Sequence, residues 1–181
     1  MTTTMKTKRI SIIVMAIFSL VAISCNEVEK LLTFNISNET TFKISSGIPI
    51  DSPFNAPTPD VTTNSSAEFK NNSTRADLVK DVKLQELKLT ITSPVDKTFS
   101  FLKSVHMYIS TTANDEIELA YLDNVNTTSN TITLICSSAK LDSYIKASSY
   151  KIRTSVTTKE VFNQEIQVKA NMNFKVTADP F

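Results

Sequence analysis

The chain has 181 residues, with 19 basic and 18 acidic side chains, one glycine, one histidine, two cysteines and no tryptophan. With Gly47 as the only glycine, glycine-rich phosphate loops, dinucleotide fingerprints and G-x-S-x-G nucleophile elbows are excluded. With His106 as the only histidine, two-histidine zinc sites are excluded. Basic and acidic residues are nearly equal in number, which argues against nucleic acid binding, because such binding requires a basic face. We therefore expect no cofactor, no metal centre and no nucleic acid partner.

Residues 1–24 have the three zones of an export signal. Lys6, Lys8 and Arg9 precede the almost wholly apolar segment 10–23, and small residues then lead to Cys25. This order is typical of a secretory signal peptide. The apolar segment has only fourteen residues, whereas a bilayer-spanning helix needs about 20, so it is too short for a permanent span.

The cleavage region, Ala22-Ile23-Ser24-Cys25, resembles the bacterial lipobox and departs from its commonest form at Ala22, where leucine is usual. The resemblance implies that Cys25 becomes the lipidated N-terminus of the mature protein, since acyl chains anchor a protein by burying methylene groups in the bilayer. The alternative is an uncleaved or soluble secreted protein. Cleavage would leave 16 basic against 18 acidic residues, a net charge of about −2, which does not favour a polybasic membrane patch.

Residues 25–30 would then form a short linker, and residues 31–181 a single domain, since the mature length of 157 residues suits one domain. Glu27 and Glu29 weakly resemble the acidic tract of surface-exported lipoproteins in Bacteroidota, although solvated linker residues explain them equally well. With Cys25 lipidated, Cys136 is the only thiol, so neither an intramolecular disulfide nor a thiolate cluster can form.

Most of the domain shows apolar residues at period two, which predicts strands with one buried and one solvated face. The clearest alternation runs from Ile166 to Val176. Further strands are predicted, in chain order, at residues 32–36, 42–44, 87–91, 105–109, 117–121, 132–136 and 150–156. In the segment 117–121 we expect Ile117, Leu119 and Tyr121 to face inward. Pro94 is expected to end the strand that contains residues 87–91.

Three segments depart from this alternation. Residues 73–82 place Ala76, Val79 and Val82 at helical spacing and predict a short helix. Residues 138–147 predict a second helix, residues 99–102 a helical turn, and the proline-rich segment 46–59 a loop or irregular edge. Together these elements predict a mostly β fold, an antiparallel β-sandwich of the immunoglobulin-like or a related kind, with a barrel as the alternative.

Two passages carry a family resemblance. They are residues 87–105, containing Leu87-Lys88-Leu89-Thr90-Ile91-Thr92-Ser93-Pro94, and residues 141–153, containing Leu141-Asp142-Ser143-Tyr144-Ile145-Lys146. Over roughly residues 75–178 the chain is similar to uncharacterised lipoproteins of Bacteroidota. The resemblance implies an envelope location and a β-rich domain, and it supplies no activity or catalytic residues.

Few residues are candidates for chemistry. His106 is expected on the polar side of its strand without an orienting carboxylate, and Cys136 is expected to be a buried, inert thiol. Oxygen-rich segments at 114–116 and 123–126 leave a calcium site open, although turn formation explains them better. Phe54, Phe101 and Phe162 do not fit the strand alternation, so they are either contact residues for a partner or residues that close the ends of the core.

These observations favour a non-enzymatic, lipid-anchored module of the cell envelope, at the outer membrane, that binds an envelope protein or a glycan. Two alternatives stay open. One is a hydrolase that uses paired carboxylates. The other is a carrier of apolar ligands, with a cavity lined by Phe34, Phe42, Met107 or Phe174.

The lipidation prediction has a direct test. When cells expressing the chain are fed a labelled fatty acid, the protein should incorporate the label, and Cys25→Ala should abolish it. Cys136→Ala is the matched control and should keep the full label, because it removes the other cysteine. Equal labelling of the two variants would contradict the prediction.

Overall fold

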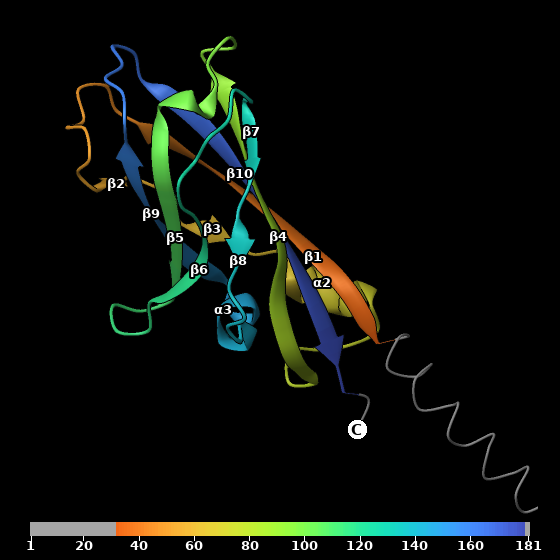
Figure 1. Ribbon diagram of the computed structural model, residues 1–181. Helices are drawn as coiled ribbons and strands as arrows, with labels where there is room; N and C mark the ends of the chain where they lie inside the picture. Colours follow the sequence, from red (N-terminus) through yellow and green to blue (C-terminus); the bar gives the residue numbers. More distant parts are fainter. Residues whose placement is uncertain (1–31, 180–181) are drawn as a thin grey trace, which may run out of the picture. The chain divides into compact units, whose positions relative to one another are not determined.

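The computed structural model describes residues 32–179, which form two β-sheets (Figure 1). The four strands of sheet A lie in the order β1 (Thr33–Ile44), β10 (Ile166–Ala178), β4 (Val79–Ser93) and β7 (Thr131–Thr133). Sheet B contains six strands: β2 (Phe54–Ala56), β9 (Ser149–Thr158), β5 (Leu102–Ser110), β6 (Ile117–Leu122) and β8 (Ile135–Cys136) in that order, with β3 (Val61–Thr62) also paired to β9. The predicted mostly β, antiparallel sandwich is confirmed.

The signal segment 1–24 and the whole linker 25–30, including Cys25, lie outside the described residues, so their predictions are not tested by the structure. Within the described part of the chain, no helix has the length and apolar character needed to cross a bilayer.

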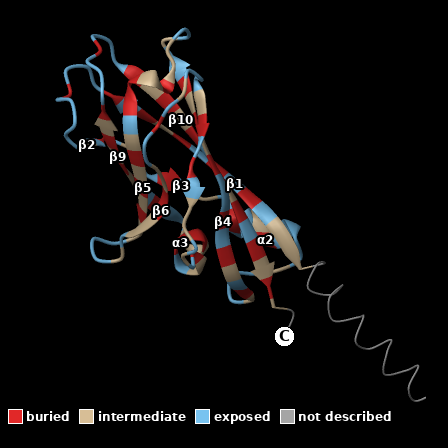
Figure 2. Cartoon of the chain, viewed as in Figure 1, coloured by how far each residue is buried: buried red, intermediate tan, exposed pale blue. Residues whose placement is uncertain are grey.

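Strand β10 shows how the core forms. Its inner residues, Val168, Ala170, Met172, Phe174 and Val176, are each at most 1% exposed, whereas the residues between them face outward (Figure 2). Burial of a large apolar side chain contributes about 1.5–3 kcal/mol, so a face of this length holds the sheets together. The predicted alternation of Ile166 to Val176 is confirmed.

The predicted helix at 73–82 is wrong, because Val79 begins the long strand β4. An irregularity in its pairing with β10 explains the error: Ala178 pairs with Val79 and Thr177 with Asp81, so Lys80 is skipped. The skipped residue is a β-bulge, which spaces buried residues by three instead of two. Val79 and Val82 are therefore buried at a helix-like spacing within a strand.

The helices of the domain are short. The helix α2 (Ser65–Asn71), which the sequence did not predict, buries Phe69, and α3 (Asp142–Lys146) occupies part of the predicted segment 138–147. A single 3-10 turn, η1 (Phe99–Phe101), confirms the predicted helical turn, and β4 ends at Ser93 as expected.

The structure adds detail to two other segments. The proline-rich segment 46–59, predicted as a loop or irregular edge, contains the short strand β2, which pairs with β9 at the edge of sheet B. The predicted strand 132–136 is divided, because β7 pairs with β4 in sheet A and β8 pairs with β6 in sheet B. This segment therefore connects the two sheets along one side of the sandwich.

The core predicts the cost of truncating Phe174, whose side chain is fully buried. Phe174→Ala should lower the free energy of unfolding by about 3–5 kcal/mol, because it removes apolar burial and leaves a cavity. Chemical denaturation followed by circular dichroism measures this. Val161→Ala, at a residue 71% exposed, should leave the midpoint nearly unchanged, and similar losses for both variants would contradict the assigned core.

Candidate functional site

A bulge in β6 determines which side chains face outward on sheet B. Met107 pairs with Ala120, whereas the next residue, Tyr108, pairs with Glu118, so Leu119 is the extra residue. Leu119 and Ala120 are both fully buried, and the alternation is reversed after them. Tyr121 therefore lies opposite His106 on the outer face, and its predicted inward position is wrong.

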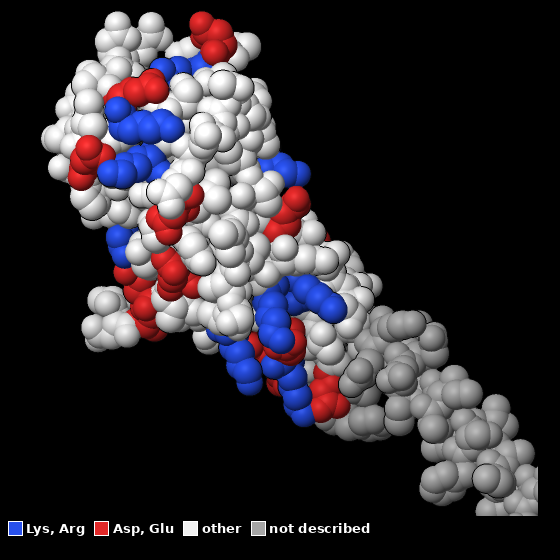
Figure 3. All heavy atoms as spheres, in the orientation of Figure 1, with Lys and Arg blue, Asp and Glu red and all other residues white. Residues whose placement is uncertain are grey.

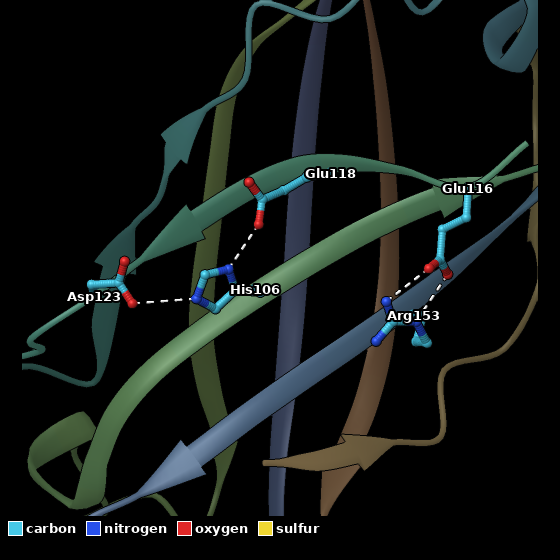
Figure 4. Close-up of polar contacts among 5 residues, drawn as sticks. All are labelled: His106, Glu116, Glu118, Asp123 and Arg153. Carbon is cyan, nitrogen blue, oxygen red and sulfur yellow. Dashed lines mark hydrogen bonds and ion pairs between the residues drawn. The ribbon is translucent and has the colours of Figure 1, made fainter.

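His106 lies between two carboxylates on this outer face (Figure 4). Its Nδ1 is 2.7 Å from Oε1 of Glu118 on β6, and its Nε2 is 3.2 Å from Oδ1 of Asp123, just after β6. The imidazole also stacks on Tyr121, with ring centroids 5.8 Å apart and an interplanar angle of 16°. The imidazole is therefore held at both ring nitrogens and on one ring face. Its side chain is still 30% exposed, so solvent reaches it.

These carboxylates set the charge of the histidine. Burial lowers the pKa of His106, but the hydrogen bonds and negative charges of Glu118 and Asp123 outweigh burial and raise the pKa above its ordinary value of 6.5. The surroundings therefore favour the imidazolium, in which both ring nitrogens donate hydrogen bonds.

Arg153 on β9 forms a second cluster beside the first. Its Nε donates to Oε2 of Glu116 at 2.9 Å and its Nη2 donates to Oε1 at 2.7 Å, a bidentate pair that also lowers the pKa of Glu116 (Figure 4). Its Nη1 donates to Oδ1 of Asn55 on β2 at 3.0 Å. The guanidinium carbon lies 4.0 Å from the ring centroid of Tyr108, within the range of a cation–π contact.

The two clusters form one surface, which we call the outer patch. Tyr108 connects them, since its ring lies against Arg153 on one side and its centroid is 6.5 Å from that of His106. The outer patch consists of His106, Tyr108, Glu116, Glu118, Tyr121, Asp123 and Arg153. It spans β9, β5 and β6, so three paired strands fix its geometry.

The geometry of His106 differs from that of a catalytic base. A base must hold a nitrogen free for the proton of a nucleophile, yet both nitrogens of His106 contact carboxylates. Ser155 on β9 lies opposite His106. The described hydrogen-bond partners of the imidazole are Glu118 and Asp123, and Ser155 is not one of them. The arrangement stabilises a cation on a surface and does not form a nucleophile–base pair.

The sequence missed the carboxylates around His106, although part of the pattern was visible. Glu116 and Glu118 are two residues apart, as are His106 and Tyr108, so each pair shares one face of its strand. Pairing the two segments as a hairpin would have placed them together. The contact with Tyr121 could not be found in this way, because it depends on the bulge at Leu119.

The three aromatic residues singled out in the sequence lie in two places. Phe101 is fully buried and Phe162 is 8% exposed, and their ring centroids are 5.0 Å apart beneath Nζ of Lys97. These two rings contribute to the core, and Phe162 also lines a hollow of about 160 Å³. Phe54, on β2, is half-buried against the core. The binding role of the three residues stays a prediction.

The remaining candidates have structural explanations. The carboxylate of Asp115 accepts hydrogen bonds from the backbone N–H groups of Thr111 and Thr112 at 2.8–3.2 Å, so the segment 114–116 closes a turn. Cys136 is half-buried, and burial raises the pKa of its thiol, which disfavours the reactive thiolate. Among residues 32–179, no group of histidine, cysteine and acidic side chains is arranged to hold a metal ion.

The sequence suggested four residues as the lining of a cavity for an apolar ligand. Three of them are packed in the core, namely Phe42, Met107 and Phe174. The fourth, Phe34, makes an edge contact with Phe69, with ring centroids 6.2 Å apart. Both signs of charge are interspersed on the face of the molecule seen in Figure 3. The described surface on that side therefore carries no extended basic region.

Comparison with known proteins gives little further guidance. No family model and no curated protein matches the chain. One similar solved structure is from Desmodium yellow mottle tymovirus, at 12% identity, covering 82% of this chain and 83% of the other, with a TM-score of 0.26. A likeness at that TM-score carries no argument about fold or function.

The His106 cluster predicts a titration that is simple to observe, because the chain has only one histidine. In an NMR titration, His106 should show a pKa above 6.5, and both Glu118→Gln and Asp123→Asn should lower it. Glu116→Gln is the matched control and should change it little, because that carboxylate pairs with Arg153. A pKa at or below 6.5 in the unaltered protein would contradict the cluster.

The same shift predicts the direction of a stability change. Because the folded-state pKa of His106 is the higher one, its charged contacts stabilise the fold fully below the unfolded pKa of about 6.5, and this stabilisation is lost as the pH rises through the folded pKa. The difference in unfolding free energy between the unaltered protein and His106→Gln should therefore shrink from about pH 6 to about pH 9. Denaturant titrations at both pH values measure it, and a growing difference would contradict the assignment.

Proposed function

We propose that the chain is a lipid-anchored, non-enzymatic protein of the cell envelope, at the outer membrane, that binds a partner protein through the outer patch. The export signal, the lipobox-like segment ending at Cys25 and the similarity to lipoproteins of Bacteroidota support the location. The outer patch supports the mode of action, and it is the observation on which the proposal depends.

The composition of the outer patch suits protein recognition. Tyrosine and arginine are the residues that most often dominate protein–protein interfaces, and Tyr108, Tyr121 and Arg153 lie together here. The charged groups are already paired, as Arg153 is with Glu116, so binding would not leave them without a counter-charge. An interface of this kind would bury tyrosine rings at its centre and keep the ion pairs at its edge.

Rigidity also favours binding. Side chains that are already ordered lose little conformational freedom when a partner docks, which reduces the entropic cost of association. Arg153 is ordered by Glu116, Asn55 and Tyr108, and His106 by Glu118, Asp123 and Tyr121, all on or beside paired strands. The patch is therefore prepared for contact before a partner arrives.

The anchor would keep this surface near the membrane. Seven residues separate Cys25 from Thr33, the first residue of β1. A fully extended segment of that length spans at most about 25 Å. A lipidated chain would therefore present the domain to components at or close to the membrane surface, which favours an envelope partner over a freely diffusing one.

The proposal is tested by affinity purification of the full-length, anchored chain from detergent-solubilised envelope, with quantitative mass spectrometry of the proteins that co-purify. The unaltered chain should enrich a specific partner, and Tyr121→Ala and Arg153→Ala should each reduce its recovery roughly tenfold, equivalent to about 1.4 kcal/mol of binding free energy.

Lys175→Ala is the matched control, since Lys175 is an exposed, outward-facing residue of β10 in the other sheet, and it should leave recovery unchanged. Membrane fractionation of each variant confirms that it is still anchored. Absence of any enriched protein, or equal recovery with the patch variants, would contradict the proposal.

A further inference from the structure

A hollow of about 390 Å³ lies on the outer face of sheet A, separate from the outer patch. It is lined by Ser37, Asn38, Glu39, Glu86, Asn171, Met172 and Asn173, which come from β1, β4 and β10. The volume lies within the range of about 300–1,000 Å³ that small-molecule sites occupy. Its lining residues are mostly polar, and the exposed ones include Asn171 and the two glutamates, so an apolar ligand does not suit it.

The hollow lies at the bulge in β4. Asn173 of β10 pairs with Glu86, but the next residue, Phe174, pairs with Leu84, so Gln85 is the extra residue. Bulges bend a strand locally and often lie beside functional sites, where they redirect side chains. Glu86 consequently faces outward beside Asn173, on the same face as Asn171.

A buried polar contact lies on the inner side of the strands that carry the hollow. Asn38 is 9% exposed, and its Nδ2 donates to the hydroxyl of Tyr150, at 3.1 Å, from the opposite sheet. The Tyr150 hydroxyl in turn donates to Sδ of Met172 at 4.0 Å. Since Tyr150 and Met172 are each 1% exposed, the Asn38 amide is held in one orientation by the core.

Asn173 has an unsatisfied amide oxygen. Its Oδ1 is buried and has no hydrogen-bond partner among the described residues, although Asn173 lines the hollow. Leaving a buried acceptor unpaired is unfavourable. A rotation of the Asn173 amide toward the hollow would let it accept a hydrogen bond from a ligand hydroxyl, which favours a ligand that donates hydrogen bonds.

The charges of the hollow are already balanced. Glu39 pairs with Lys169 at 2.6 Å, and Glu86 lies 3.3 Å from Lys88. An anion would meet the carboxylates, and a cation would compete with these lysines. The groups left for a ligand are amides, which both donate and accept hydrogen bonds, and the Ser37 hydroxyl, which does the same.

A sugar hydroxyl also donates and accepts, so adjacent hydroxyls of one ring match a pair of asparagine amides. We propose that this hollow binds the hydroxyl groups of a neutral saccharide unit, as a second site that does not depend on the protein-binding role of the outer patch. Asn171 and Asn173 would make the contacts.

The test is isothermal titration calorimetry of the full-length chain in detergent against neutral probes, namely maltotetraose, cellotetraose and N-acetylchitotetraose, with tetragalacturonate as the acidic comparison. At least one neutral probe should bind, and the double variant Asn171→Ala/Asn173→Ala should weaken its affinity at least roughly tenfold. Asn126→Ala, at an exposed loop residue outside the hollow, should leave affinity unchanged.

Asn171→Trp provides a second test, because Asn171 is exposed and a bulky ring there would fill the hollow without removing a buried contact. It should also abolish binding, while circular dichroism shows an intact fold. Failure of all neutral probes, preference for tetragalacturonate, or binding that survives both variants would overturn the proposal. Loss of partner recovery in the outer-patch variants is a separate measurement and would not bear on this result.

Discussion

The packing of β10 against sheet B is the interaction on which the rest of the domain depends. β10 lies between β1 and β4 in sheet A, and its inner residues are almost completely buried. Among the described residues the one cysteine is unpaired, so this apolar packing, and not a disulfide, holds the described sheets together. The hydrogen bond across the core from Asn38 to Tyr150 adds orientation to a contact that is otherwise non-directional.

Both candidate binding surfaces arise where this regular packing is interrupted. A bulge in β6 at Leu119 turns Tyr121 outward beside His106, and a bulge in β4 at Gln85 places Glu86 beside Asn173. In each case one extra residue leaves the core intact, because burial resumes at Ala120 in β6 and at Leu87 in β4. The same local device therefore gives each sheet an outer face that differs from a simple polar surface.

The sequence predicted the strands well where alternation is uninterrupted, as in Ile166 to Val176, because period two and a buried face are the same physical constraint. It was wrong where a bulge broke that period: Val79 and Val82 suggested a helix, and Tyr121 was placed inside. It also missed the contacts of Glu118 and Asp123 with His106, which depend on strand register and on a turn. Short strands such as β2 were not predicted, because three residues carry almost no periodic pattern.

The strand order of sheet A has a consequence for how the chain acquires its fold. The first strand, β1, pairs with the last, β10, so more than a hundred residues separate the partners of that edge. Such non-local pairing is slow to form because the intervening chain must first be brought together. Sheet A cannot close until residues 166–178 have been synthesised, and until then β1 presents unpaired backbone groups and an apolar face that other chains could bind. Stable folding of sheet A therefore begins only when nearly the whole chain has been synthesised.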